Sequence, residues 1–215
     1  MTNHKHILAF DCSSPYATVA LNDAQHSLPH GQQAGLLVPT IEALLAEQGI
    51  GYAQLAGICT TIGPGSFTGL RIALATAHGL ALAQNLPLYT TTSLAALAED
   101  YFTSHAATEV EVAYHAGKGE VFVQCFARSA RLPKAQDEIS PVPTEGYVPR
   151  LPHAISNLPL GGCLPVAGVE ALSLVRMASQ LQPTPLPEAM PLYIRPPDAK
   201  IPALPAWLRE TDLSL

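Results

Sequence analysis

The sequence predicts an α/β protein of two domains, the second of them reduced, and three observations lead to this prediction. Strand-like and helix-like segments alternate through the first half of the chain. Proline becomes dense after residue 133, where helical periodicity fades. The 215 residues are 48% hydrophobic and 13% charged, a composition that supports a buried core.

The first half carries eight expected elements. Strands are expected at 6–11, 16–22, 25–28, 55–62 and 87–92, and helices at 33–48, 68–84 and 94–102. Strands followed by helices imply a mixed sheet covered by helices. This is the layout of one ribonuclease-H-like half of the actin and sugar-kinase superfamily.

Two local expectations concern the ends of these helices. Pro39 lies inside the pattern of the first helix, so we expect a kink there or a start near Val38. Ser93 precedes the third helix and is expected to cap it.

Fewer secondary-structure elements are predicted in the second half of the chain. Paired strands are expected at 110–115 and 120–126, around a glycine-containing turn, and one helix at 168–181. We therefore expect a ribonuclease-H-like domain at 1–105 and a smaller, proline-rich domain at 106–215.

Charge and cysteine content narrow the classes of function. The formal net charge is −6, and no basic stripe of the kind that neutralises nucleic-acid phosphates is present. The four cysteines form no Cys-x-x-Cys pair, so we expect free thiols and no metal site. The apolar run at 7–10 is too short for a signal peptide, and 69–83 is too short to span a bilayer. We expect a cytoplasmic protein.

The stretch Gly63-Pro64-Gly65-Ser66-Phe67-Thr68-Gly69-Leu70-Arg71 is the most informative, because it joins an expected strand to an expected helix. Its glycines allow close backbone approach, and Ser66 or Thr68 can cap the helix. Free backbone N–H groups at a helix start favour anions. The spacing is not that of a Walker A loop.

Asp11 and Ser13 stand at the end of the first strand, where actin-like ATPases hold phosphate and magnesium. We therefore expect nucleotide or anion contacts at one set of residues: Asp11, Ser13, Gly63, Gly65, Ser66, Thr68 and Gly69. Arg71 opposes the helix dipole in the first turn, and this predicts a nearby anion or acidic partner. A side chain that bends into solvent is the alternative for Arg71.

The expected helix at 68–84 has no charged face. Leu70, Leu74, Ala77 and Ala81 form one apolar stripe, and the other sides carry Ala75, Gly79, Leu82 and Ala83. One side can cover the sheet while another meets a partner chain. The alternative is a helix buried within its own domain.

The segment Gly63–Ile72 resembles the signature of the TsaB family, also known as YeaZ. Similar matches run in the same order: residues 7–11, 36–41, 87–88 with 92–94, 119–122 and 193–195. The resemblance covers nearly the whole chain, densely to residue 126 and sparsely afterwards.

This resemblance implies a two-domain actin-like fold and a partner, the catalytic subunit TsaD, in the modification that places threonylcarbamoyl on adenosine in tRNA. It implies a small ATPase, TsaE, as a third protein, contact with tRNA only through the complex, and no membrane. The chain itself is then non-catalytic, with no catalytic or metal-binding residue, and ATP or ADP enters only in the assembled complex. The implied interface comprises Leu36, Leu37, Thr40, Arg71, Ala75, His78, Gly79 and Leu82. Without its partner the chain can pair with itself through the same helices.

The chain departs from the family pattern at three positions. Gln33 replaces a histidine found in many members, and His115 and Gly117 stand where the family has Asp-Ala-Arg before Gly-Glu-Val. Any role of those polar residues is therefore altered here.

The alternative function is an independent actin-like ATPase or a glycopeptidase-like hydrolase. No second Asp-Gly-rich phosphate loop follows residue 110. No His-Glu-x-x-His or Gly-x-Ser-x-Gly motif occurs, and Pro29 interrupts the His26–His30 pair. These observations favour the non-catalytic subunit.

Overall fold

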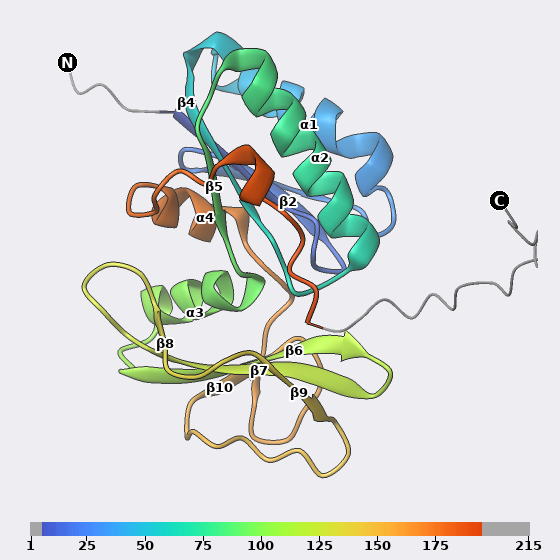
Figure 1. Ribbon diagram of the computed structural model, residues 1–215, viewed down its shortest axis with the longest axis vertical. Coiled ribbons are helices and arrows are strands. Elements are labelled where there is room, and N and C mark those ends of the chain that lie inside the picture. The colour runs from blue at the N-terminus through green and yellow to red at the C-terminus, as the bar shows by residue number, and fades with distance from the viewer. Residues whose placement is uncertain (1–5, 195–215) are drawn as a thin grey trace, which may run out of the picture.

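Two β-sheets organise the chain, and the computed structural model describes it from residue 6 to residue 194. The five-stranded sheet lies in the upper part of Figure 1 and the six-stranded sheet in the lower part. We call the parts of the molecule built on these sheets the first lobe and the second lobe.

The first sheet has the order β3-β2-β1-β4-β5. Its strands are β1 (His6–Asp11), β2 (Ala17–Leu21), β3 (Ala24–Leu28), β4 (Leu55–Thr61) and β5 (Leu88–Thr91). The first three pair antiparallel as a meander, while β4 and β5 join in parallel. In register, Leu8 faces Leu21 on one side and Ile58 on the other. The expected mixed sheet is confirmed.

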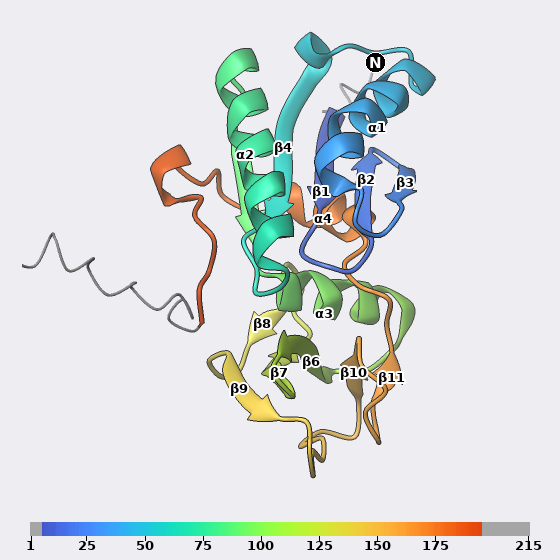
Figure 2. The ribbon, with the colours of Figure 1, turned by 90° about the vertical axis from the view of Figure 1, so that its right-hand side faces the viewer.

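Helices α1 (Gln33–Glu47) and α2 (Phe67–Gln84) cover one face of this sheet (Figure 2). A short 3-10 helix, η1 (Tyr52–Gln54), leads into β4. The core under the two helices includes Phe10, Val19, Ile41, Leu44 and Leu74, all at most 4% exposed. Apolar residues at helical spacing thus meet the buried side of the sheet.

Helix α1 runs through Pro39, so the alternative start near Val38 is wrong. Proline removes the bond to the carbonyl four residues earlier, which belongs to Gly35. Gly35 is exposed, so water can reach that carbonyl and the helix tolerates the loss.

Helix α3 (Ser93–Ser104) is capped by Thr92, not by Ser93 as expected. The Thr92 hydroxyl accepts a hydrogen bond from the Ala95 amide over 3.1 Å. Ser93 is the first helical residue and is fully buried, with its hydroxyl turned towards Ser13.

Helix α4 (Ala171–Ala178) is shorter than the expected 168–181. Residues 168–170 stay outside the helix because the backbone at Val169 bonds to the first lobe: Thr18 Oγ1 donates to the Val169 carbonyl over 2.9 Å. The same hydroxyl accepts from the Ala171 amide over 3.1 Å.

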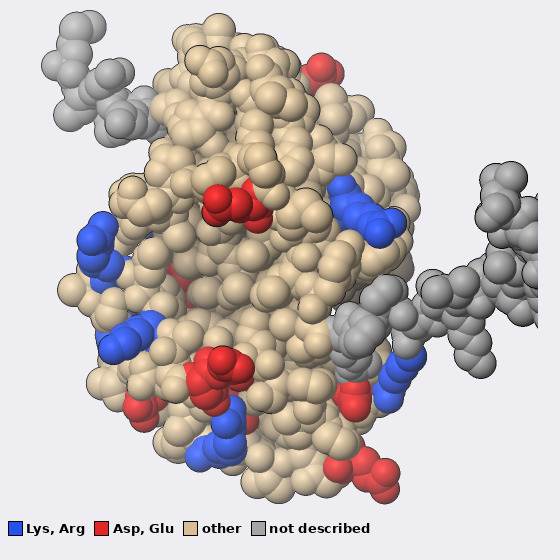
Figure 3. All heavy atoms as spheres, viewed as in Figure 1, with Lys and Arg blue, Asp and Glu red and all other residues tan. Residues whose placement is uncertain are grey.

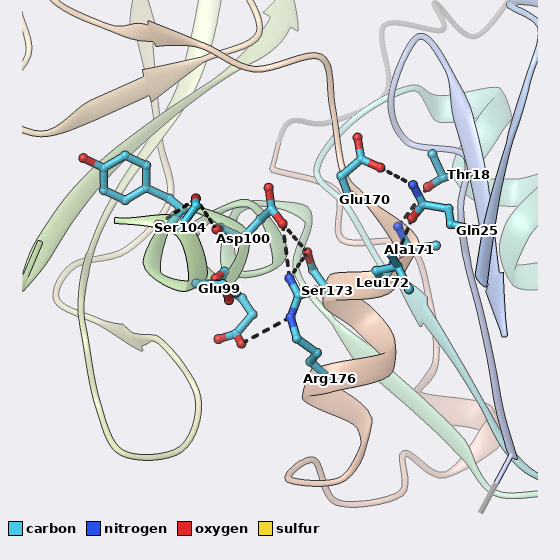
Figure 4. Close-up of polar contacts among 12 residues, drawn as sticks. Thr18, Gln25, Glu99, Asp100, Ser104, Glu170, Ala171, Leu172, Ser173 and Arg176 are labelled. Carbon is cyan, nitrogen blue, oxygen red and sulfur yellow. Dashed lines mark hydrogen bonds and ion pairs between the residues drawn. The ribbon is translucent and has the colours of Figure 1, made fainter. Parts of the chain in front are cut away.

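The chain returns to the first sheet at α4, which contacts β1, β2 and β4 on the face opposite α1 and α2. Figure 4 shows how α4 is held to α3: Arg176 Nη2 donates to Asp100 Oδ1 over 3.1 Å, and Ser173 Oγ donates to the same oxygen over 3.2 Å. The division of domains at residue 105 stays a prediction.

The second sheet has the order β11-β10-β6-β7-β8, with β9 also paired to β7. Its strands are β6 (Glu109–Gly117), β7 (Glu120–Ala127), β8 (Lys134–Ala135), β9 (Ser140–Pro143), β10 (Ala154–Ser156) and β11 (Leu164–Pro165). The β6–β7 hairpin confirms the expected strand pair. Its turn places Gly117, Lys118 and Gly119 at positive φ.

The segment after α4 runs back along the edge of the first sheet, past the 3-10 helix η2 (Leu186–Glu188). The Thr184 amide donates to the Leu88 carbonyl of β5 over 2.7 Å, and the Leu192 amide donates to the Ile62 carbonyl over 2.7 Å. Tyr193 then packs on Phe67, with ring centroids 5.6 Å apart. Arg195, part of the family match, lies outside the described residues.

Candidate functional site

The turn after β1 encloses the carboxylate of Asp11, which is 0% exposed. Its Oδ2 accepts hydrogen bonds from the Ser13 amide over 3.0 Å, the Ser14 amide over 3.2 Å and the Ser14 hydroxyl over 3.0 Å. Its Oδ1 accepts from the Thr61 hydroxyl over 2.5 Å. Each carboxylate oxygen offers about two lone-pair positions, so Oδ2 has none left while Oδ1 keeps one.

Burial raises the pKa of Asp11 above its usual value, and hydrogen bonds from Thr61, Ser13 and Ser14 oppose that rise. The charged form therefore relies on these donors for the solvation that water no longer provides. Because Asp11 is 0% exposed, it could hold a magnesium ion only if the turn around it opened.

The loop before α2 lies directly on this turn. The Ser66 amide donates to the Ser13 carbonyl over 2.8 Å. A Cβ on Gly65 would lie 2.7 Å from the Ser13 Cβ and carbonyl oxygen, and a Cβ on Gly69 only 1.8 Å from the Cys12 carbonyl oxygen. The close approach that these glycines predicted is an approach to the chain's own turn.

Ser66, rather than Thr68, caps α2, because its Oγ accepts from the Gly69 amide over 3.2 Å. Thr68 is exposed in the first turn. Arg71 is exposed, as the alternative expected, and forms no ion pair with an acid among residues 6–194; its guanidinium carbon lies 3.9 Å from the centroid of the Phe67 ring. The negative ring face stabilises this cation.

A cleft of about 780 Å³ opens between the lobes, bounded by the starts of α1 and α2 and by the β6–β7 turn. Five of the seven expected anion-contact residues line it: Ser13, Gly65, Ser66, Thr68 and Gly69. Asp11 and Gly63 are buried and are not among the lining residues.

The three departures from the family pattern meet in this cleft. Gln33 lines it from α1, and His115 and Gly117 line it from the β6–β7 turn. Positions far apart in the sequence are thus brought together across the gap between the lobes.

Most of the expected interface residues are accessible on α1 and α2. We call them the partner face: Leu36, Thr40, Arg71, Ala75, His78, Gly79 and Leu82. On α2 the exposed members recur at helical spacing, and Leu82 is 70% exposed. The prediction that Leu37 belongs to the interface is wrong. Its side chain lies in the core, is 1% exposed and cannot reach a partner.

Sequence reasoning missed several residues of the buried network, among them Ser14, Thr61 and Tyr114. The position of Thr61 at the end of β4 could have indicated its contact with Asp11. β1 and β4 are adjacent parallel strands, so their carboxyl ends share one edge of the sheet. No feature of the sequence indicates the contact of Tyr114, because its hydroxyl bonds to Ser14, a hundred residues away in sequence.

The described residues, 6–194, carry neither a metal-binding cluster nor a membrane-spanning helix. In this range no three His, Cys, Asp or Glu side chains are grouped to hold a metal ion. None of the helices described there is both long enough and apolar enough to cross a bilayer.

Comparison with known proteins gives consistent matches. Residues 30–139, just over half of the chain, match the family model described as TsaD, tRNA N6-adenosine threonylcarbamoyltransferase. The tRNA threonylcarbamoyladenosine biosynthesis protein TsaB of Haemophilus influenzae is 34% identical over 127 residues, 57% of this chain and 54% of that protein. TsaB of Escherichia coli is 33% identical over 121 residues, 54% and 52% of the two chains.

A crystal structure from Pseudomonas aeruginosa is also similar. It is described as an uncharacterised protein with similarity to peptidase YEAZ. It superimposes with a TM-score of 0.76 at 25% identity, over 89% of this chain and 100% of that one.

The mixed first sheet, covered by α1 and α2 on one face and by α4 on the other, with an acid at the end of β1, defines an actin-like, ribonuclease-H-like α/β protein. Within that class the matches are more specific. The chain belongs to the family of that TsaD model, and the relatives that it resembles within these comparisons are TsaB (YeaZ) proteins. It spans about half the length of the curated relatives that it matches.

Proposed function

We propose that this chain is a non-catalytic subunit in the biosynthesis of threonylcarbamoyladenosine in tRNA. It pairs through the partner face with a TsaD-like catalytic subunit, and a TsaE-like ATPase joins the assembly in the cytoplasm. The observation that carries this proposal is the uncharged, exposed side of α2 formed by Ala75, Gly79 and Leu82.

Gly79 is the most informative member of the partner face. Glycine inside a helix costs about 0.8–1.0 kcal/mol relative to alanine. A Cβ on Gly79 would meet nothing within 4 Å, so the described part of the chain gives no packing reason for a glycine. Close approach of a second backbone is a reason that supports the proposed interface.

Leu82 supports the same surface. It exposes 70% of its area, although an exposed helix ordinarily turns charged residues to solvent. Figure 3 shows a mostly uncharged surface over α1 and α2.

Charge supports an indirect role towards tRNA. The net charge is −6, and on the face drawn in Figure 3 the basic side chains form no continuous stripe. Phosphate neutralisation supplies most non-specific nucleic-acid affinity. We therefore assign the tRNA contact to the complex and not to this chain alone.

The alternative is an independent ATPase or hydrolase. The carboxylate of Asp11 is enclosed by Ser13, Ser14 and Thr61, which argues against a free metal ligand there. We keep ATP or ADP as a ligand of the assembled complex only, with contacts from the cleft residues Ser66, Thr68 and Gly69. Turnover by the pure chain that disappears in Asp11→Ala would establish the alternative.

The deciding experiment is size-exclusion chromatography with light scattering on this chain, alone and mixed with the TsaD protein of the same organism. We expect a one-to-one complex that replaces any homodimer. Gly79→Glu should weaken this association at least tenfold while leaving thermal unfolding unchanged or raised, because glutamate is the better helix former.

The matched control is Gly161→Glu in the second lobe, where a Cβ also meets nothing within 4 Å. It should pair normally. Normal pairing by Gly79→Glu would refute the interface, and no association of the unaltered chain, even with added nucleotide, would refute the proposed function.

A further inference from the structure

The hydroxyl of Ser14 joins three distant segments of the chain. It donates to Asp11 Oδ2 over 3.0 Å and accepts from the Tyr114 hydroxyl over 3.0 Å and from the Val169 amide over 2.9 Å. A serine hydroxyl has one hydrogen to donate and two lone pairs to accept with. All three are used, and Ser14 is 1% exposed.

These partners come from different parts of the molecule. Asp11 ends β1 in the first sheet, Tyr114 lies on β6 in the second sheet, and Val169 belongs to the stretch that leads into α4. Tyr114 is 1% exposed, so water does not replace Ser14 as the hydrogen-bond partner of its hydroxyl. A Cβ on the neighbouring Gly168 would lie 2.5 Å from the Ser14 Cβ, so the stretch lies against the turn with no room for a side chain.

We propose that the hydrogen bond from Tyr114 to Ser14 is a latch that holds the two lobes at one angle and so fixes the width of the cleft. Ser14 lines the cleft from the first lobe and Tyr114 lines it from the second. Breaking the bond lets the two walls separate. This inference stands independently of the proposed partner.

Other contacts hold the lobes together when the latch opens. The Ser93 hydroxyl donates to the Ser13 hydroxyl over 3.0 Å, and Arg176 ties α4 to α3 through Asp100 (Figure 4). Removing the Tyr114 hydroxyl should therefore loosen the lobe angle without unfolding either sheet.

The test compares Tyr114→Phe with Tyr147→Phe by hydrogen exchange of the full chain. Both variants delete one tyrosine hydroxyl bonded to a partly or fully buried group, but the Tyr147 hydroxyl donates to Glu111 inside the second lobe. In Tyr114→Phe we expect exchange about fivefold faster, the factor for one lost hydrogen bond, at residues 13–14, 66–69 and 168–169. Amides in the middle of α1 should keep their rates.

In Tyr147→Phe the faster exchange should stay near Glu111 and residues 147–150. Unchanged exchange at 13–14 and 168–169 in Tyr114→Phe would overturn the latch. So would the same pattern in both variants, or a uniform increase that includes α1, since either result would mean a general loss of stability instead of a released contact.

Discussion

The backbone amide of Ser66 donates a hydrogen bond to the carbonyl oxygen of Ser13 over 2.8 Å, which ties the loop before α2 to the turn after β1. The two segments lie backbone against backbone, and this closeness sets the tolerance of the loop for side chains.

Gly69→Ala should therefore destabilise the protein strongly. The new Cβ would lie 1.8 Å from the Cys12 carbonyl oxygen, so loop and turn must separate. Overpacking of this kind costs about 1–3 kcal/mol or more. Gly79→Ala is the control, with open space at the Cβ and an expected gain of about 0.8–1.0 kcal/mol from helix propensity. Urea unfolding measures both, and equal stability of the two variants would contradict the packing.

Ser66→Ala should remove the cap of α2. The Gly69 amide loses its acceptor, and the loss of such a cap costs about 1 kcal/mol. Thr68→Ala, two residues further on, should change the free energy of unfolding by less than about half of that, as is usual for exposed positions. Thermal unfolding distinguishes them, and a larger loss in Thr68→Ala would show that the wrong residue had been identified as the cap.

Asp11→Asn should alter how stability depends on pH. Burial raises the pKa of Asp11 in the folded chain. The stability that comes from this shift is fully present below the unfolded pKa of about 3.9 and is lost as pH rises through the folded pKa. Asparagine does not ionise, so its stability relative to the unaltered chain should rise between pH 4 and neutrality. Urea midpoints of both chains across that range provide the measurement, and a constant difference would disprove the expected shift.

Cys125 should react slowly with thiol reagents. Burial, followed by its hydrogen bond to Glu111, raises the pKa of this thiol to about 12. Only the thiolate reacts, so labelling should be very slow at pH 8 and rise about tenfold for each pH unit. Mass spectrometry of the labelled native chain can follow this residue. Rapid labelling at pH 7 would mean that the thiol is not held in this network.

The sequence predicts much of the first lobe, because its strands are continuous apolar runs and its helices carry clear periodicity. That residues 168–170 lie outside the helix could not be predicted, since the Thr18 and Ser14 hydroxyls that hold Val169 lie some 150 positions away in sequence. For the site, the loop at 63–69 was found through its glycines and the Ser66 cap. The enclosure of Asp11 by hydrogen-bond donors could not be predicted, because they come from the turn after β1 and, 50 positions away in sequence, from the end of β4.

The strip of chain from Thr184 to Leu192 has a consequence for handling the protein. β5 is the outer strand of its sheet, and the Thr184 amide occupies the outward carbonyl of Leu88. Uncovered outer strands are templates for pairing with other molecules. A chain cut before residue 184 would expose that strand and the apolar surface beneath Ala189, and we expect it to aggregate where the longer chain stays dispersed.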